Sequence, residues 1–447
     1  MSNAPDDGIL PLARDLNERL DKAAPEVLEM LSALGRRLYF PKGILTQSAE
    51  AKAKAHRFNA TIGIATEKGE PMHLPSVAKH LVGLTPAEAF PYAPPSGQQA
   101  LRERWREKTL RENPALEGRA FGLPIVTSAI THGLMLVGDL FVDPGDVLVL
   151  PDKLWGNYRL TYEVRLGARI VTHPFFAGEG YDTAGFARAL EEAAEGREKV
   201  IALLNFPNNP TGYMPTDAEV ASIRDALLRV AEGGTKVVAV LDDAYFGLFY
   251  HLGRESATQS IFGHLVNAHP NLLAVRLDGA TKELFVWGLR CGFLTFGPGR
   301  AESADEVCEV LEAKVKGAIR SAVSNVPQLS QTLVSKALAS PEIDREREEK
   351  AGILRVRAEK VYEVARAPRF RESWDVYPFN SGYFMCVAVR GAPAEQVRLH
   401  LLDSYGIGTI ATGPEDLRIA FSCLEVEEVE PLFEALHKAI QELREPD

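Results

Sequence analysis

The chain has 447 residues, of which 46% are hydrophobic and 25% are charged, so it is long enough for two or more folded units with large apolar cores. Its formal net charge of -11 argues against a general nucleic-acid or membrane-surface binder, because such proteins present basic faces. The composition is that of an ordinary globular protein, which needs neither disulfides nor a structural metal.

The cysteines and histidines form no metal-binding or disulfide pattern. The four cysteines contain no CxxC pair, and the ten histidines contain no HExxH motif. We therefore expect no metal site and a reducing compartment. The N-terminus is acidic and lacks the apolar core of a signal sequence, and no run of about 18 apolar residues is present. These features predict a cytoplasmic protein with no membrane span.

The first third of the chain is expected to be largely helical. Residues 11–40 have the spacing of one or two amphipathic helices, and residues 57–75 are irregular. Residues 98–113 have the pattern of a charged amphipathic helix.

Short apolar runs alternate with helical stretches between residues 120 and 300. Several of these runs, such as KVIALLN and VVAVL, are continuous, which is typical of strands that are covered on both faces. Strands interleaved with helices predict an α/β fold with a mostly parallel sheet.

The last third begins with helices and returns to strands. Residues 302–365 are strongly helical, and residues 340–365 have the pattern of one long helix that links two units. Strands are expected in 374–389 and 416–422, and helices near 394–405 and 425–443.

Polar residues follow two of the apolar runs. Asn-Pro-Thr-Gly follows KVIALLNFP and brings Asn209 to the carboxyl end of a strand, where α/β sheets bind ligands. The next run ends in Asp242 and Asp243, shortly before Tyr245. An acidic residue at such a position is costly unless it meets a cation, and the alternative for a lone aspartate is a helix N-cap.

Lys282 precedes the apolar stretch LFVW, where a lysine is unusual. Its ammonium either reaches the surface or its amine takes part in chemistry. Asn-Pro-Thr-Gly, then Asp-x-Ala-Tyr, then this lysine with Gly-x-Arg-x-Gly resembles the fold-type I aminotransferases of class I/II, which use pyridoxal phosphate (PLP). The resemblance runs over residues 59–422, which is most of the chain.

The resemblance implies an architecture. We expect a large PLP-binding domain at 75–345, with a mostly parallel seven-stranded sheet sandwiched by helices. The smaller α/β domain is expected to combine the N-terminal segment 1–74 with residues 346–447. The family also implies a homodimer with shared active sites. The N-terminal 50 residues are not explained by the resemblance.

The family's catalytic residues fall on named positions. The resemblance implies that Lys282 holds PLP as a Schiff base and later moves a proton, which requires its amine to be neutral for part of the cycle. Asp242 would pair with the pyridine nitrogen and keep the ring an electron sink, whereas Asp243 faces the opposite side of the strand. Tyr245 and Asn209 would hydrogen-bond the phenolic oxygen of the cofactor.

The phosphate group of the cofactor needs cations and amide donors. The resemblance assigns it to Arg290 and to a turn at a helix N-terminus formed by Ser128, Ala129 and Ile130. The family often has Ser or Thr three residues before the lysine, and this chain has Gly279 there. Thr281 is the candidate to replace that hydroxyl.

Two aromatic residues complete the implied cofactor site. Trp155 is expected to stack on the pyridine ring, with an ordinary core position as the alternative. Tyr92 is expected to reach the phosphate of the neighbouring subunit. His132, just beyond the phosphate turn, is interpreted as a structural residue.

Substrate binding is assigned by the same resemblance. Arg418 would clamp the α-carboxylate, and the alternative is a surface arginine on an edge strand. Gly63 falls where the family's backbone passes close to substrate, and Phe384 would form a side wall. Arg320 and Ser324 keep the spacing of a segment in aspartate aminotransferases, where the arginine binds the distal carboxylate across the dimer. The alternative for Arg320 is a solvated helix residue.

The predicted function is transfer of an amino group from an L-amino acid, preferably aspartate or glutamate, to a 2-oxo acid. An aminotransferase for neutral or aromatic amino acids, or a PLP-dependent lyase or decarboxylase, would keep the same cofactor residues. A regulator on this fold would carry an added DNA-binding region, and the first 60 residues show no basic helix-turn-helix pattern.

Overall fold

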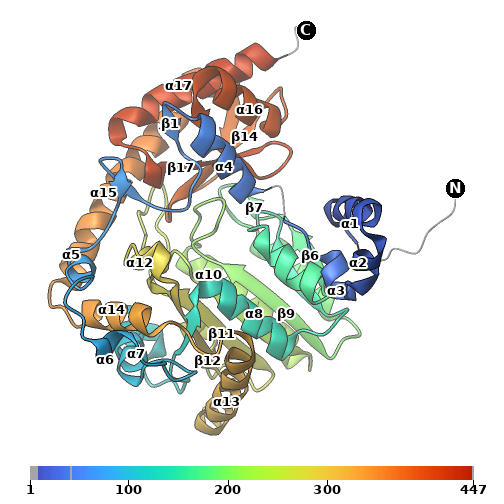
Figure 1. The fold of residues 1–447 in the computed structure, drawn as a ribbon, viewed down its shortest axis with the longest axis vertical. Coiled ribbons are helices and arrows are strands. Elements are labelled where there is room, and N and C mark those ends of the chain that lie inside the picture. Colours follow the sequence, from blue (N-terminus) through green and yellow to red (C-terminus); the bar gives the residue numbers. More distant parts are fainter. Residues whose placement is uncertain (1–8, 41–42, 445–447) are drawn as a thin grey trace, which may run out of the picture.

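The computed structural model describes residues 9–40 and 43–444. Its largest element is a seven-stranded sheet with β4 at one edge and β6 at the other. Figure 1 shows β12 and β11 toward one side of the sheet and β6 toward the other. From edge to edge its strands are β4 (Ile125–Ser128), β12 (Cys291–Gly297), β11 (Leu272–Gly279), β10 (Lys236–Asp242), β9 (Lys199–Asn205), β5 (Val147–Pro151) and β6 (Arg169–His173). Only β12 runs antiparallel to its neighbours among these paired strands. The predicted α/β, mostly parallel sheet is confirmed.

The continuous apolar strands divide their side chains between two cores. In β9, Ile201 and Leu203 join one core, and Val200 and Leu204 join the other. This alternation is what the two-residue period of a strand dictates. One core is covered by α8 (Ala129–Phe141), and the other by α9 (Thr183–Ala194) and α10 (Asp217–Glu232). Helices on both faces explain why the runs are apolar throughout.

Further helices surround this sheet. They are α5 (Pro75–Ala78), α6 (Pro86–Ala89), α7 (Gln99–Glu112), η1 (Pro114–Leu116), the π-helical turn η2 (Arg159–Arg165), α11 (Phe262–Leu265), α12 (Ala280–Glu283), η3 (Trp287–Leu289), α13 (Ala304–Ala322) and α14 (Gln328–Leu338). Two hairpins of short strands also occur, β2 (Thr66–Glu67) with β3 (Glu70–Pro71), and β7 (Phe176–Ala177) with β8 (Gly180–Tyr181).

A second, four-stranded antiparallel sheet is formed by the C-terminal part of the chain. Its order is β13 (Trp374–Val376), β14 (Phe384–Val389), β17 (Asp416–Ala420) and β16 (Ile410–Ala411). The helices and short elements of this part are η4 (Pro368–Phe370), α16 (Ala394–Tyr405), η5 (Phe421–Cys423) and α17 (Val426–Leu443). Figure 1 shows α16 and α17 on the outer side of this sheet.

One long helix, α15 (Ile343–Ala365), connects the two sheets, as the sequence predicts. It contacts α17 and η5 beside the second sheet, and α5 beside the first. The predicted domain boundary at 345/346 falls inside this helix, so one continuous helix joins the two parts. The boundaries themselves stay a prediction.

The N-terminal segment divides its contacts between the two sheets. Helices α1 (Pro11–Ala23), α2 (Pro25–Met30) and α3 (Ala33–Arg37) form a separate group, and α3 contacts η2 beside the large sheet (Figure 1). In contrast, α4 (Ile44–Lys54) and β1 (Phe58–Asn59) pack on β15 (Ile407–Gly408) and β16. No helix within residues 9–40 and 43–444 is long and apolar enough to cross a membrane.

Candidate active site

A cavity of about 180 Å³ opens at the carboxyl ends of the central strands. Parallel pairing brings these ends together, because Asn205 of β9 is in register with Asp242 of β10, and β10 with β11. The cavity is lined by Ile44, Gly63, Ala129, Ile130, Thr131, Trp155, Tyr158, Asn205, Asn209, Asp242, Ala244, Tyr245, Thr281, Lys282, Arg290, Phe384 and Arg418. Thirteen of these residues come from the first sheet and its connections, between Ala129 and Arg290, and the others come from the N-terminal segment and the second sheet.

Lys282 lies in the single turn α12, directly after β11, and its amine faces this cavity. No carboxylate of the described residues lies within ion-pair distance of its Nζ atom, which sits 5.1 Å from the ring centroid of Tyr245. Burial lowers the pKa of Lys282 to about 8, with Arg290 adding to this and Asp242 opposing it. A lysine with this pKa is partly neutral near pH 7, as a nucleophile or proton carrier requires.

The two aspartates at the end of β10 face opposite sides. Asp242 turns into the cavity, and its Oδ2 accepts a hydrogen bond of 2.6 Å from the hydroxyl of Tyr158. Asp243 turns away and pairs with Arg276 at 2.6 Å. Burial raises the pKa of Asp242 to about 6, against the opposing effects of Tyr158 and Lys282. Asp242 is therefore ionised at neutral pH and presents a negative charge to the cavity.

Arg418 is buried on β17, and this strand has neighbours on both sides, so the edge-strand alternative is wrong. Its guanidinium donates to Oδ1 of Asn209 at 2.9 Å and to the carbonyl oxygen of Thr61 at 2.8 Å. Its Nε has no hydrogen-bond partner among the described residues, and the group lies 4.1 Å from the ring centroid of Phe384. A buried, incompletely bonded guanidinium is suited to an anionic ligand.

The amide of Asn209 is oriented by this contact. Because Oδ1 accepts from Arg418, the amide nitrogen remains as a donor toward the cavity. The Asn209 backbone N–H donates to Oδ1 of Asn205, whose own Nδ2 donates to the carbonyl oxygen of Asp242 at 2.9 Å. Asn205 thus ties the Asn-Pro-Thr-Gly loop to the end of β10.

The turn between β4 and α8 brings a helix N-terminus to the cavity. Ala129 has a φ of 60°, and Ala129, Ile130 and Thr131 line the cavity. Ser128 does not line it, and its backbone N–H donates to Nδ1 of His132 at 3.1 Å. The free N–H groups of a helix start favour an anion such as phosphate.

Gly279 is explained by the neighbouring strand. A Cβ atom on Gly279 would lie 2.8 Å from the Cα of Gly292 on β12, so a serine or threonine does not fit there. Thr281 lines the cavity instead, and its buried Oγ1 has no hydrogen-bond partner among the described residues. This unpartnered hydroxyl is a donor available to a ligand.

Arg290, Trp155 and Gly63 complete the lining. Arg290 is exposed at the cavity, and its Nη1 donates to the carbonyl oxygen of Trp287 at 3.1 Å. Trp155 packs edge-to-face against Tyr158, with ring centroids 5.6 Å apart. A Cβ on Gly63 would lie 3.4 Å from the Phe384 ring and 3.7 Å from the hydroxyl of Tyr245, so the backbone there runs along the cavity wall.

Like Ser128, two further residues predicted for the site lie outside this cavity. Tyr92 is 89% exposed, and Arg320 is exposed on α13 with its guanidinium donating to Oγ of Ser324 at 2.5 Å. Both were expected to act across a dimer. That role stays a prediction, because the structure contains a single chain.

The decisive comparison is with the family described as aminotransferase class I and II, whose model matches residues 64–436. The chain belongs to this family. The predicted family and its fold-type I architecture are confirmed, and the family consists of PLP-dependent transferases.

Several curated relatives have aspartate aminotransferase names, and another is named histidinol-phosphate aminotransferase. The chain is 26% identical over 323 residues to the probable aspartate/prephenate aminotransferase of Aquifex aeolicus, covering 70% of this chain and 73% of the relative. It is 26% identical over 204 residues to the cytoplasmic aspartate aminotransferase of Saccharomyces cerevisiae, covering 45% of this chain and 46% of the relative. The chain thus spans less than half the length of the yeast relative it matches.

Solved structures support the fold over more of the chain. An aminotransferase from Anaerococcus prevotii has a TM-score of 0.80 at 23% identity and covers 92% of this chain and 99% of its own. The kynurenine aminotransferase of Pyrococcus horikoshii has a TM-score of 0.77 at 17% identity, covering 94% and 99%. At these identities the likeness establishes the fold and leaves the substrate open.

The cavity of this family member contains the donors that PLP requires. Asp242 would provide an acceptor for the protonated pyridine nitrogen, Lys282 an amine for the aldehyde, and Asn209 an amide donor for the phenolic oxygen. The unpartnered hydroxyl of Thr281 and the start of α8 provide donors for the phosphate. The residues present therefore fit the cofactor.

Some lining residues were not predicted from the sequence, namely Tyr158, Asn205, Thr131 and Ile44. Asn205 could have been found, because it ends the same apolar run that precedes the Asn-Pro-Thr-Gly loop. Tyr158 follows Trp155 by three residues, which puts both on one face of a helical turn. No sequence signal pairs Tyr158 with Asp242, 84 positions later.

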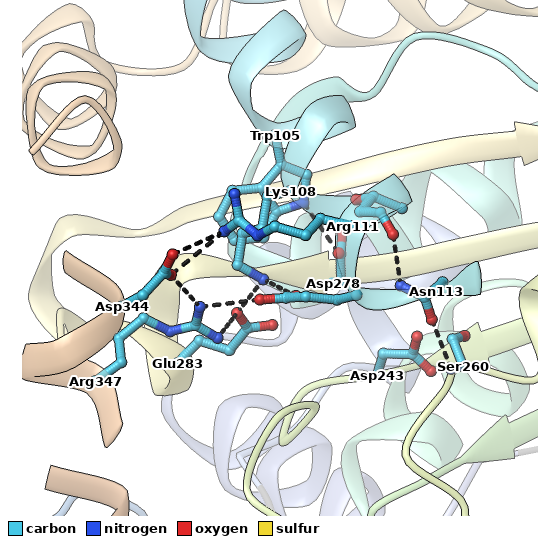
Figure 2. Close-up of polar contacts among 12 residues, drawn as sticks. Trp105, Lys108, Arg111, Asn113, Asp243, Ser260, Asp278, Glu283, Asp344 and Arg347 are labelled. Carbon is cyan, nitrogen blue, oxygen red and sulfur yellow. Dashed lines mark hydrogen bonds and ion pairs between the residues drawn. The ribbon is translucent and has the colours of Figure 1, made fainter. Parts of the chain in front are cut away.

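A dense group of buried charges lies on the other side of the same strand ends. Glu283, the residue after Lys282, lies between Lys108 at 2.5 Å and Arg347 at 3.2 Å (Figure 2). Arg276 pairs with Asp243 and also with Asp278, the latter at 2.9 Å. We call Lys108, Glu112, Asp243, Arg276, Asp278, Glu283 and Arg347 the rear charge cluster. Through Glu283, this cluster holds α12 on the side that faces away from the cavity.

Proposed function

We propose that this chain is a PLP-dependent aminotransferase that moves an amino group from an L-amino acid to a 2-oxo acid. One observation supports the proposal most directly. The amine of Lys282 has no carboxylate partner and faces the same cavity as Asp242 and the buried guanidinium of Arg418. That combination matches an amine nucleophile, a cofactor carboxylate and a substrate clamp.

Each group has a defined role when the cofactor is bound. Bound PLP supplies an electron sink for the negative charge that develops at the substrate α-carbon. Asp242 would hold the protonated pyridine nitrogen, and Tyr245 and Asn209 would hydrogen-bond the phenolic oxygen. The phosphate would be held by Arg290, Thr281 and the amides of Ala129 and Ile130, near Ser128. Trp155 would lie against the ring.

Lys282 would carry the proton between the substrate α-carbon and the cofactor carbon that takes up the amino group. A pKa of about 8 allows its amine to accept a proton and return it at neutral pH. Arg418 would hold the substrate α-carboxylate, since its Nε is unpartnered. Gly63 and Phe384 would form the wall along which the substrate side chain lies.

The preferred substrate is proposed to be a dicarboxylic amino acid, in a homodimer. Arg320 of one subunit would meet the distal carboxylate in the site of its partner, and Tyr92 would reach the partner's phosphate. The relatives named aspartate aminotransferase support this assignment. The likeness to a kynurenine aminotransferase keeps neutral and aromatic substrates as the second candidate. A cytoplasmic location also stays a prediction.

The test is the absorbance of the cofactor-loaded protein before and after L-aspartate is added without a keto acid. We expect the cofactor band to convert to that of pyridoxamine phosphate, with oxaloacetate released in equal amount. A band that persists with aspartate and glutamate but converts with a neutral amino acid would reject the dicarboxylic assignment. Release of carbon dioxide or ammonia instead of a keto acid would favour a decarboxylase or lyase.

Arg320→Leu tests the distal-carboxylate role. It should raise the KM for aspartate at least tenfold, about 1.4 kcal/mol, and leave alanine turnover unchanged. Lys316→Leu, which removes an exposed charge one turn earlier on α13, is the matched control. Unaltered aspartate kinetics in Arg320→Leu would show that this arginine is a solvated helix residue.

A further inference from the structure

Tyr158 has a position that the proposed reaction does not account for. Its side chain is buried, and its hydroxyl donates to Oδ2 of Asp242 at 2.6 Å. The other oxygen of that carboxylate accepts from the backbone N–H of Ala244 at 3.1 Å. Each oxygen of Asp242 is therefore held by one protein donor and keeps lone-pair capacity for a ligand.

The Tyr158 hydroxyl is a neutral donor, so it leaves the negative charge of the Asp242 carboxylate in place. A phenol hydrogen bond stabilises the ionised form of Asp242, but it adds no positive charge that would cancel it. Burial opposes ionisation of Asp242, and burial together with the neighbouring carboxylate raises the pKa of Tyr158 far above its ordinary value. Tyr158 thus remains a protonated donor at neutral pH.

Tyr158 is buried among packed neighbours. It immediately precedes η2, and its ring packs edge-to-face against Trp155, which lines the cavity. Tyr162, one turn later, is equally buried, but its hydroxyl donates to the carbonyl oxygen of Leu134 at 3.2 Å and does not touch Asp242. The two tyrosines differ in the acceptor of their hydroxyl groups, and this makes Tyr162 a matched control.

We propose that Tyr158 is a positioning residue that fixes the carboxylate of Asp242 toward the cavity and favours its ionised form. The inference rests on the proposed function, because Asp242 must face the cofactor for its orientation to matter. Through Asp242, Tyr158 sets how strongly the pyridine nitrogen is held in its protonated state.

The experiment compares Tyr158→Phe with Tyr162→Phe in the cofactor-loaded protein. Tyr158→Phe should weaken PLP binding roughly tenfold or more, because a hydrogen bond to a charged group is lost. It should also shift the pH titration of the cofactor absorbance upward, since Asp242 then protonates at a higher pH as the pH falls. Tyr162→Phe should change neither the dissociation constant nor the titration.

A double substitution separates a positioning role of Tyr158 from a merely structural one. In an Asp242→Asn background, Tyr158→Phe should add little further loss of PLP affinity, whereas a merely structural role predicts additive losses. Wild-type titration and affinity in Tyr158→Phe, or additive losses, would overturn the inference. A wild-type protein that binds no PLP would instead overturn the proposed function.

Discussion

The cavity and the rear charge cluster are built from residues that are adjacent in the sequence but face opposite sides of the strand ends. Asp242 faces the cavity and Asp243 the rear cluster, and the same division separates Lys282 from Glu283. In the rear cluster, Asp243, Asp278 and Glu283 each have an opposite charge within 3.2 Å. In the cavity, Lys282 has no such charge partner among the described residues. Thr281 Oγ1 and Arg418 Nε lack hydrogen-bond partners there, as do Asp278 Oδ1 and Glu283 Oε1 in the rear cluster, so the two sides differ in their ion pairs.

The difference shows what each side contributes. A buried charge without an opposite charge is costly, so Lys282 and Arg418 in one cavity indicate that a ligand completes them. Buried charges with partners instead hold the strand ends in place, and they destabilise the fold mainly when one member is removed. Function is therefore expected to depend on the cavity side and stability on the rear side, although both belong to the same two chain segments.

Lys282→Ala should produce the largest change. We expect kcat to fall by at least about 10⁴-fold, because the amine that carries the proton is gone. The unfolding midpoint should stay equal or rise, since a buried amine without an ion-pair partner is removed. Steady-state kinetics and thermal denaturation measure the two effects. A large loss of stability would contradict the division between the two sides.

Lys108→Met is the rear counterpart of that substitution. Lys108 lies 2.5 Å from both Glu283 and Glu112, so its removal leaves carboxylates buried with fewer cations. We expect the free energy of unfolding to fall by about 3 kcal/mol. Urea denaturation followed by circular dichroism checks this value. The fraction that remains folded should still bind PLP, and loss of binding without loss of stability would argue against a structural role.

Thr281→Val tests the unpartnered hydroxyl of the cavity. Loss of a hydrogen bond to a charged phosphate should weaken PLP binding by about 1.5–3 kcal/mol, roughly 10–100-fold, with little change in stability. Thr109→Val is the control, because the Oγ1 of Thr109 accepts from Arg276 in the rear cluster at 3.3 Å. Fluorescence titration of both variants with PLP should separate them. Equal affinities would assign the phosphate to other donors.

The pH dependence of Lys282 gives the smallest but most specific effect. Its pKa of about 8 lies below the ordinary value, so the neutral amine increases as pH rises through 8. Below that pH, reductive methylation of Lys282 by formaldehyde in the PLP-free protein should rise about tenfold per pH unit and then level off. Mass spectrometry of peptides measures it. Lys108, buried between carboxylates, should stay unmodified as long as the protein is folded.

The same linkage has a consequence for stability. Between pH 8 and the ordinary lysine pKa, the unfolded chain binds a proton at Lys282 that the folded chain does not. Stability from this group therefore increases with pH across that window and is constant below it. Lys282→Ala should remove this slope from the pH dependence of the unfolding free energy.

The sequence was informative where local pattern decides structure. Short apolar runs between residues 120 and 300 predicted the mostly parallel sheet, and the polar residues after two of these runs brought Asn209 and Asp242 to the ligand-binding edge. The family resemblance added Lys282. Contacts between distant segments were not predictable in this way. The bond from Tyr158 to Asp242 depends on how η2 packs over β10, and periodicity carries no information about that packing.

Arg418 and Arg320 illustrate the same limit. Both alternate with or follow apolar residues, but Arg418 is buried because β17 pairs on both sides, whereas Arg320 ends an exposed helix face. Sheet order decides the first case, and it is a property of the whole chain. A second subunit would decide the role of Arg320, and a single sequence cannot describe that contact.

The glycine at 279 also restricts which side chains this site can hold. Gly279 faces Gly292 across β11 and β12, and a Cβ on Gly292 would in turn lie 2.9 Å from the Cα of Ala129. Three backbones are stacked here without side chains between them. A hydroxyl cannot be introduced at 279 by one substitution, because β12 and the turn between β4 and α8 would have to move as well. In this chain the hydroxyl that faces the cavity is that of Thr281, and a designer who wishes to relocate it must redesign all three segments together.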